Sequence, residues 1–365
     1  MKLRIAQVTP GYYPHIGGVE KVVQSISEEM VKKGHEVEVL TIGAQDVRDK
    51  GEQPFILNDV AIKRFPASGP FRYAKGLYSH LIAQKLKYDI VHAHSFHTLL
   101  PLLACQAKEK AGFKLILTGY YHGQGGKRLT NLLLHSGRFW FSRVYQKADL
   151  ILGLTEFEKC LLKQHFHLPE SKIRIIPSGV AVEKISCVRP LGKSGEEKIL
   201  LIVSRLEKYK NIHLAIRAVP YLPEDYRLVI IGDGPYRQQL ESYVNTLDLK
   251  ERVSFLGQFP EEEVYQWYKI CNLVLNLSSL ESFGLTVIEA LAAGKPVLVN
   301  NISALNDLAQ KFTGATAVNI RQTPPQELAR VIKECVLMPY PQPNLSEYRW
   351  ETIAEKITNT YKTIL

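Results

Sequence analysis

Residues 281–299, ESFGLTVIEALAAGKPVLV, predict a loop, a helix, a turn and a buried strand in succession. If the helix begins near Gly284, the backbone N–H groups of its first turn and the positive end of its dipole form a cradle for a diphosphate. Glycine at this position lets a phosphate approach the backbone closely. The segment therefore indicates an α/β protein with an anion site at the carboxyl end of a strand.

Two glutamates flank this predicted cradle. Side chains of a helix lean toward its N-terminus, so Glu289 on the second turn is expected to point back at the bound group and accept both hydroxyls of a ribose. Glu281 precedes the helix and is placed to accept hydroxyls of a sugar beyond the second phosphate. The alternative is that Glu281 and Ser282 only cap the helix and that Glu289 is an exposed or paired helix residue.

A basic segment favours the ligand interpretation. Residues 204–211, SRLEKYKN, follow directly on the predicted strand 198–204. Open α/β sheets bind ligands at the carboxyl ends of their strands. Arg205 and Lys210 are therefore expected to neutralise a leaving diphosphate.

Short β-rich runs alternate with helical patterns along most of the chain, which predicts crossover units and parallel sheets. The first alternation contains strands at 3–8, 36–42, 89–93 and 114–118 and a helix at 19–33. The second begins after a linker at 190–197 and contains strands at 198–204, 226–231 and 272–277. We expect domains at 1–187 and 188–340, and a C-terminal segment, 341–365, whose helix returns to the first domain.

Composition is consistent with two soluble or peripheral domains. The 365 residues are 45% hydrophobic, enough for two cores. The five cysteines form no C-x-x-C pair, so neither a disulfide framework nor a zinc site is indicated and a reducing cytoplasm fits best. Cys160, in a helical pattern, is expected to be a buried thiol. Neither a signal peptide nor a membrane-spanning helix is expected.

The formal charge of +10 is concentrated in the first half of the chain. Two stretches without acidic residues carry it: Lys63, Arg64, Arg72, Lys75, Lys85 and Lys87 in the first, and Lys127, Arg128, Arg138, Arg143 and Lys147 in the second. The second stretch contains Phe139, Trp140 and Phe141, a combination that suits an anionic membrane surface. A solvated face over a core aromatic cluster is the equal alternative.

Together these motifs resemble the retaining glycosyltransferases of family 4, which have the GT-B fold: two Rossmann-like doubly wound domains with an interdomain cleft and a C-terminal helix that crosses back. The resemblance rests on the Glu-x7-Glu of 281–289, the Arg205 and Lys210 spacing, and the Gly-Lys-Pro-Val of 294–297. The resemblance extends over nearly the whole chain through further motifs: YYPHIGGVE (12–20), HAHS (92–95), TGYYHG (118–123), IGDGP (231–235) and the closing Trp350, Glu351 and Tyr361.

The resemblance implies site residues and a metal-independent hexose transfer from a UDP- or GDP-sugar, with no further cofactor. The first domain, 1–187, would bind the acceptor, and the second, 188–340, would bind the nucleotide sugar. Gly17 and Gly18 would approach the donor phosphates, and Arg205 and Lys210 would bind the diphosphate. The donor sugar and its phosphate would be bound by Glu281, Ser282 and the backbone of Phe283, Gly284 and Leu285. Glu289 would bind the ribose, and the backbone near Phe259 to Glu261 would bind the base. His122 would contact the sugar near the reaction centre. Ser178 to Ala181 and Ser303 to Asp307 depart from the family pattern, which leaves the donor sugar open.

Several other sites are disfavoured. His92, His94 and His97 lack a partner carboxylate for a metal, and the 232–234 turn supplies only two glycines of a dinucleotide fingerprint. No nucleic-acid-reading element accompanies the charge. The remaining alternatives are a nucleotide-sugar epimerase or disaccharide phosphorylase of the same fold, and a non-catalytic carbohydrate- or membrane-binding subunit. The expected acceptor is a glycan, lipid-linked or anionic.

Overall fold

The computed structural model describes residues 1–14, 17–43, 55–68, 73–96, 98–123, 141–190, 192 and 195–365. The chain forms two compact units. Unit 1 comprises Met1–Gly179 and Trp350–Leu365, and unit 2 comprises Val180–Arg349. Each unit is built on its own largely parallel sheet with helices around it, as the alternation predicts.

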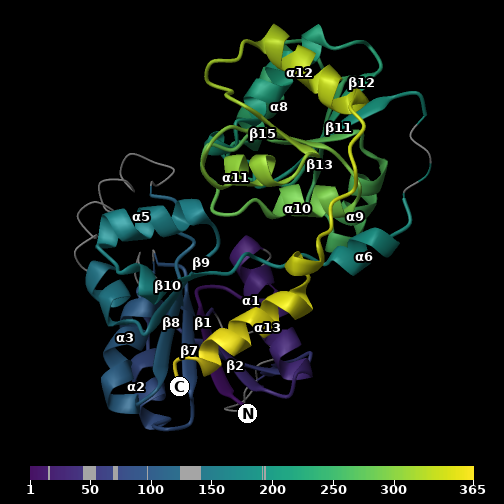
Figure 1. The fold of residues 1–365 in the computed structure, drawn as a ribbon. Helices are drawn as coiled ribbons and strands as arrows, with labels where there is room; N and C mark the ends of the chain where they lie inside the picture. The colour runs from purple at the N-terminus through teal and green to yellow at the C-terminus, as the bar shows by residue number, and fades with distance from the viewer. Residues whose placement is uncertain are drawn as a thin grey trace. The chain divides into compact units, whose positions relative to one another are not determined.

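Unit 1 contains an eight-stranded sheet in the order β10-β9-β8-β7-β1-β2-β4-β3 (Figure 1). All neighbouring pairs are parallel except β3 with β4. The order reverses between β1 and β7, which lie side by side although β2 to β6 separate them in the sequence. The strands are β1 (Arg4–Thr9), β2 (Glu36–Ile42), β3 (Phe55–Leu57), β4 (Val60–Phe65), β7 (Ile90–His94), β8 (Lys114–Thr118), β9 (Leu150–Gly153) and β10 (Ile173–Ile175), with a separate pair, β5 (Ala67–Ser68) and β6 (Tyr73–Ala74).

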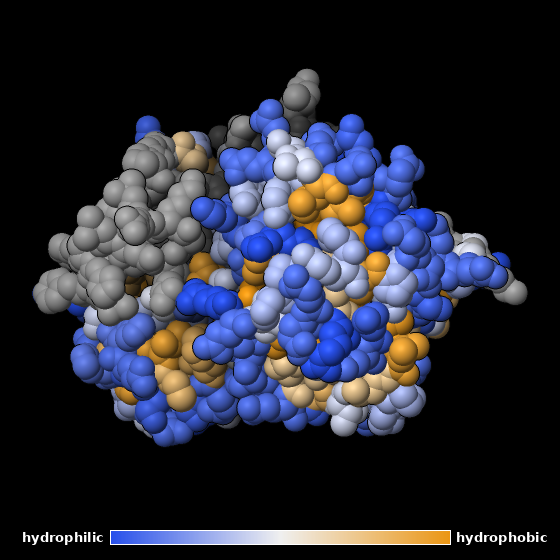
Figure 2. Space-filling model, turned by 90° about the horizontal axis from the view of Figure 1, so that it is seen from above, coloured by the Kyte–Doolittle hydropathy of each residue, from blue (hydrophilic) through white to orange (hydrophobic). Residues whose placement is uncertain are grey.

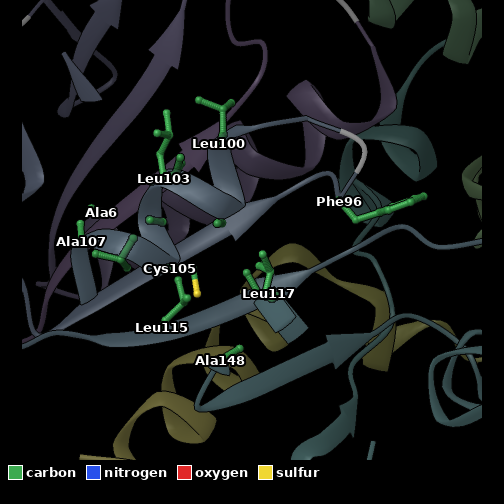
Figure 3. Packing of buried hydrophobic residues seen from close by; sticks show 14 of the residues in the cluster. Ala6, Phe96, Leu100, Leu103, Cys105, Ala107, Leu115, Leu117 and Ala148 are labelled. Carbon is green, nitrogen blue, oxygen red and sulfur yellow. The ribbon is translucent and has the colours of Figure 1, made fainter. Parts of the chain in front are cut away.

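Helices bury the faces of this sheet. They are α1 (Gly18–Lys32), α2 (Leu77–Ala83), α3 (Leu100–Ala111), α5 (Glu156–Phe166) and α13 (Trp350–Lys362). Apolar side chains of α3, among them Leu103 and Ala107, join Leu115 and Leu117 of β8 in one core cluster (Figure 3). The predicted strands 36–42 and 114–118 are correct to the residue. The central residues of 114–118 form a short apolar run that suits a strand covered on both faces, whereas 36–42 alternates glutamate with valine at its start.

The last helix of the chain completes unit 1. Helix α13 packs along α1. Its Tyr361 is fully buried and its hydroxyl lies 2.7 Å from Nδ1 of His92 on β7. The predicted return of the C-terminal helix to the first domain is therefore correct.

Unit 2 contains a six-stranded parallel sheet in the order β13-β12-β11-β14-β15-β16. Its strands are β11 (Lys198–Val203), β12 (Tyr226–Ile231), β13 (Val253–Gly257), β14 (Leu273–Asn276), β15 (Val297–Asn300) and β16 (Ala315–Val318). Its helices are α6 (Val182–Cys187), α7 (Ile212–Ala218), α8 (Arg237–Thr246), α9 (Glu261–Ile270), α10 (Leu285–Ala292), α11 (Ser303–Lys311) and α12 (Pro325–Leu337).

The units divide at different residues from those expected. The first crossing lies at Gly179 and Val180 instead of 187 and 188, because α6 packs against α10 of unit 2. Residues 341–349 also stay with unit 2. The ring centre of Tyr348 there lies 6.1 Å from that of Phe283 and 5.9 Å from that of Phe312, with the rings tilted. The carbonyl oxygen of Tyr348 accepts the N–H of Val180 at 2.7 Å.

The prediction that Cys160 is buried is wrong. It is exposed because α5 turns Glu158, Leu162 and Phe166 inward, and Cys160 falls on its outer face. Hydrophilic residues cover most of the described surface in the view of Figure 2, with separate smaller hydrophobic patches. Within the described ranges, no helix has the length and apolar character that a bilayer crossing needs.

Candidate functional site

The candidate site of unit 2 lies where the order of its strands reverses. Strands β11 and β14 are neighbours in the sheet, and the chain moves outward from them in opposite directions. Such a switch point leaves a crevice at the carboxyl ends of the two strands. The loop 204–211 follows β11 and the loop 277–284 follows β14, so both reach this edge.

Lys210 and Glu281 meet there. The Lys210 Nζ lies 2.9 Å from Oε2 of Glu281, and the two side chains are only 16% and 20% exposed. Burial alone would lower the pKa of Lys210, but the Glu281 carboxylate outweighs it and the pKa is raised. Lys210 therefore stays protonated, and its ammonium group also lies 5.4 Å from the centre of the Tyr209 ring. The positive charge of Lys210 and the carboxylate of Glu281, which can accept hydrogen bonds from hydroxyl groups, therefore lie together at the edge of the sheet.

Helix α10 begins one residue later than the sequence suggests. Gly284 is its N-cap, with φ 95° and ψ 54°, and Leu285 is its first helical residue. A side chain at Gly284 would be strained at this φ, and its Cβ would lie 3.0 Å from Cδ2 of Leu305. The buried Phe283 anchors the preceding turn near Tyr348. The first-turn N–H groups of α10 thus lie at the same edge as Lys210 and Glu281.

Glu289 is buried inside unit 2, only 7% exposed, and its Oε2 accepts a hydrogen bond of 3.1 Å from the Tyr268 hydroxyl of α9. Of the alternative that Glu289 is an exposed or paired helix residue, the exposed form is wrong, whereas the pairing with Tyr268 agrees with the paired form. A buried carboxylate held by a neutral donor suits recognition of hydroxyl groups. Its contact with a ribose stays a prediction.

The remaining predicted residues of unit 2 are more open. Arg205 has a side chain that is 71% exposed, with Nε 3.5 Å from Oε1 of Glu207. Ser282 is half-buried in the turn before α10, as is Phe259 before α9. Glu261 is the first residue of α9 and accepts a hydrogen bond from the Tyr265 hydroxyl.

The other predicted residues belong to unit 1. Gly17 is the N-cap of α1 and Gly18 its first residue, after β1. The carboxylate of Glu20 folds over this loop, so closely that a Cβ at Gly17 would collide with its Oε2. His15 and Ile16 of the same motif lie outside the described residues. His122 is half-buried after β8. His97 also lies outside the described residues.

His92 and His94 have polar partners within unit 1. His94 Nε2 lies 2.8 Å from Oε1 of Gln7, and His92 Nε2 lies 2.8 Å from Oγ1 of Thr118. Burial lowers the pKa of His94 to about 3 and also lowers that of His92, so both rings stay neutral. These histidines tie β7 to β1, β8 and α13.

Three residues of this geometry have no role in the sequence analysis. They are Tyr268, which holds Glu289; Asn211, which bonds the loop after β14; and Glu158, which bonds the segment that carries His122. The signal for Asn211 is its place between Lys210 and a helical run, since asparagine tolerates the left-handed conformation of a turn. Local pattern gives no such signal for Tyr268, whose partner is 21 residues away.

Comparison with known proteins matches both halves of the chain. Residues 16–184 match Glycosyltransferase Family 4, and residues 186–352 match Glycosyl transferases group 1. The chain is 28% identical to a glycosyltransferase of Methanocaldococcus jannaschii, over 99% of this chain and 98% of that protein. It is also 28% identical to the alpha-monoglucosyldiacylglycerol synthase of Streptococcus pneumoniae, over 97% of this chain and 82% of the relative.

A solved structure shares the fold. HepE of Anabaena, crystallised with UDP and glucose, superposes with a TM-score of 0.74 at 18% identity, over 99% of this chain and 97% of that one. The two Rossmann-like units, their matched halves and these relatives agree with the resemblance read from the motifs. The chain belongs to the family 4 and group 1 glycosyltransferases of the GT-B fold.

Proposed function

We propose that this glycosyltransferase moves a hexose, with retention of configuration, from a UDP- or GDP-sugar to a hydroxyl group of an acceptor that is a lipid, a lipid-linked molecule or an anionic glycan. The observation that carries the proposal is the Lys210 and Glu281 pair beside the N-terminus of α10, at the switch point of unit 2. A nucleoside-diphosphate sugar offers a group for each part: phosphate for Lys210 and the helix, and hydroxyls for Glu281 and Glu289.

Two relatives support the choice of substrates. The pneumococcal relative is a synthase of a glucosylated diacylglycerol by its name, and HepE was crystallised with UDP and glucose. A lipid-linked acceptor also suits the basic stretches of unit 1, where Lys85 and Lys75 are exposed. Lys127, Arg128, Arg138 and Trp140 lie outside the described residues. Attachment to an anionic membrane from the cytoplasmic side is part of this proposal.

The chemistry follows from charge development on the leaving group. As the bond between the anomeric carbon and the outer phosphate breaks, negative charge grows on that phosphate. Arg205, Lys210 and the N–H groups of α10 stabilise this charge without a metal. The acceptor oxygen attacks from the face that the phosphate leaves, and its proton passes to a phosphate oxygen. His122 contacts the donor sugar near the anomeric carbon, and no covalent enzyme intermediate forms.

The first experiment is calorimetric titration of the purified protein with UDP, GDP and ADP in the presence of a chelator. We expect one nucleotide to bind in the micromolar range, and Lys210→Ala and Glu289→Ala each to weaken it by at least tenfold. Incubation with the matching sugar donor and a diacylglycerol acceptor should then give a product with the donor's anomeric configuration by NMR.

Other outcomes separate the alternatives. Turnover of the donor without an acceptor would indicate an epimerase, and activity that requires inorganic phosphate would indicate a phosphorylase. Failure of the wild-type protein to bind any of the three nucleotides would leave a non-catalytic subunit and overturn the proposal.

A further inference from the structure

We propose that Asn211 is a positioning residue that sets Lys210 at the correct distance from Glu281 for donor binding. This inference rests on the proposed function, because it concerns the same site. Asn211 links two loops of unit 2 that reach the site from neighbouring strands, 204–211 after β11 and 277–284 after β14. We call the hydrogen bonds between these loops at Tyr209 and Asn211 the tether.

The side-chain amide of Asn211 crosses from the first loop to the second. Its Nδ2 donates 2.8 Å to the carbonyl oxygen of Leu277 and lies 2.6 Å from Oγ of Ser279. Both hydrogens of the amide nitrogen therefore have an acceptor on the loop after β14. The side chain of Asn211 therefore holds the second loop at Leu277 and Ser279, four and two residues before Glu281.

The backbone of the first loop joins the same attachment. The N–H of Ser279 donates 2.8 Å to the carbonyl oxygen of Tyr209. Residues 209 and 211 are thus both fastened to the second loop, one on each side of Lys210. A lysine side chain has many rotamers. Fixing its backbone on both sides limits the region that these rotamers can reach, and Glu281 lies within this region.

The conformation of Asn211 favours this arrangement. Its φ and ψ are 55° and 28°, in the left-handed region, and α7 starts at the next residue. Glycine adopts this region most readily, and asparagine is among the few other residues that tolerate it. A glycine would satisfy the turn alone, whereas asparagine satisfies the turn and also bridges the loops. The turn and the bridge can therefore be separated by mutation.

Asn211→Gly keeps the left-handed turn and removes both hydrogen bonds of the amide. Asp248→Gly is the matched control, because Asp248 is an exposed residue of unit 2 with φ 52°. Ser279→Ala removes one acceptor of the bridge. The double variant Asn211→Gly with Ser279→Ala completes a cycle that measures the coupling between the two side chains.

Two measurements test the tether. The first needs no ligand: amide hydrogen exchange at Ser279, resolved by NMR. We expect exchange to accelerate at least tenfold in Asn211→Gly and to be unchanged in Asp248→Gly. The second is the Kd of the nucleotide that the wild-type protein binds, with KM for its sugar donor. We expect both to rise about tenfold in Asn211→Gly, kcat to change less, and the melting temperature to stay within a few degrees.

The cycle sharpens the result. Ser279→Ala should weaken nucleotide binding in the wild-type background and have a much smaller effect in the Asn211→Gly background. Equal effects in both backgrounds, unchanged exchange at Ser279, or faster exchange with unaltered Kd and KM would each overturn the inference. A wild-type protein that binds no nucleotide, with exchange accelerated in the variant, would overturn the proposed function and the positioning role but leave the tether as a measured fact.

Discussion

At the scale of single residues, Glu289 depends on a neighbour that the sequence does not point to. Its carboxylate is buried and accepts the hydroxyl of Tyr268. We expect Tyr268→Phe to weaken nucleotide binding by about three- to tenfold, because an orienting hydrogen bond contributes about 1 kcal/mol. Calorimetric titration would measure it. Tyr243→Phe on α8 is the control, and equal affinities for both variants would contradict the role of Tyr268.

The meeting of Lys210 and Glu281 was predictable from the sequence, because each follows a strand whose carboxyl end reaches the same edge of a sheet. The roles of Arg205, Lys210 and Glu281 in binding a diphosphate sugar stay predictions. Tyr268 could not be singled out, because it meets Glu289 only when α9 packs against α10. The bridge made by Asn211 could not be predicted either, because it forms only when β11 and β14 pair in the sheet. A pattern along the chain contains no information on that pairing beyond the alternation of elements.

At the scale of elements, the start of α10 depends on Gly284. We expect Gly284→Ala to lower stability by about 1–3 kcal/mol, because alanine is strained at φ 95° and its Cβ would press on Leu305 and Leu308. Gly34→Ala is the control, since φ there is also positive but nothing lies within 4 Å of the added Cβ. Thermal unfolding of both variants separates strain from contact. Equal losses would show that the contact with α11 contributes nothing.

Helix α5 carries a buried titratable carboxyl group, that of Glu158, which holds two neighbouring backbone segments. Glu158 accepts the N–H groups of Tyr121 at 2.7 Å and Leu154 at 2.8 Å, and its own N–H is capped by Thr155. Burial raises the pKa of Glu158 to about 7, although these N–H groups oppose the shift. The folded protein therefore holds this proton more tightly than the unfolded chain. The contribution of this protonated carboxyl group to the stability of the folded protein is complete below about pH 4.5 and is lost as the pH rises through 7.

This sign gives a prediction for Glu158→Gln, which stays neutral at every pH. We expect the wild-type protein to lose stability relative to the variant between pH 5 and pH 8, by at most about 3 kcal/mol. Melting temperatures of both proteins across this range would measure the effect. A constant difference between them would contradict it.

Element boundaries were predictable to within about two residues where apolar runs are bounded by turns. Strands 36–42, 114–118 and 226–231 agree to the residue. The domain boundary was less accurate because α6 reads as the end of the first alternation, although it packs against α10.

At the scale of the whole molecule, the excess of positive charge predicts an effect on membranes. We expect replacement of Lys127, Arg128, Arg138 and Arg143 together by glutamine to weaken binding to vesicles of anionic lipid by at least tenfold, since each basic residue near such a surface contributes about 1 kcal/mol. Replacing Lys184, Lys250, Arg321 and Lys333 of unit 2 removes the same charge elsewhere. Sedimentation with vesicles would distinguish a local site from net charge, and equal losses would refute the site.

The chain passes from unit 1 to unit 2 at 179–180 and returns to unit 1 at 349–350, so unit 2 is inserted within the sequence of unit 1. Val180 and Arg349 bridge each other, so the two ends of unit 2 are adjacent. Gly179 lies under the ring of Trp350, so the two cut edges of unit 1 are adjacent as well. Genetically, the segment 180–349 is thus a cassette within a host sequence. If unit 2 binds the donor and unit 1 the acceptor, as proposed, exchange of this segment between relatives is expected to change donor specificity and to leave acceptor specificity unchanged.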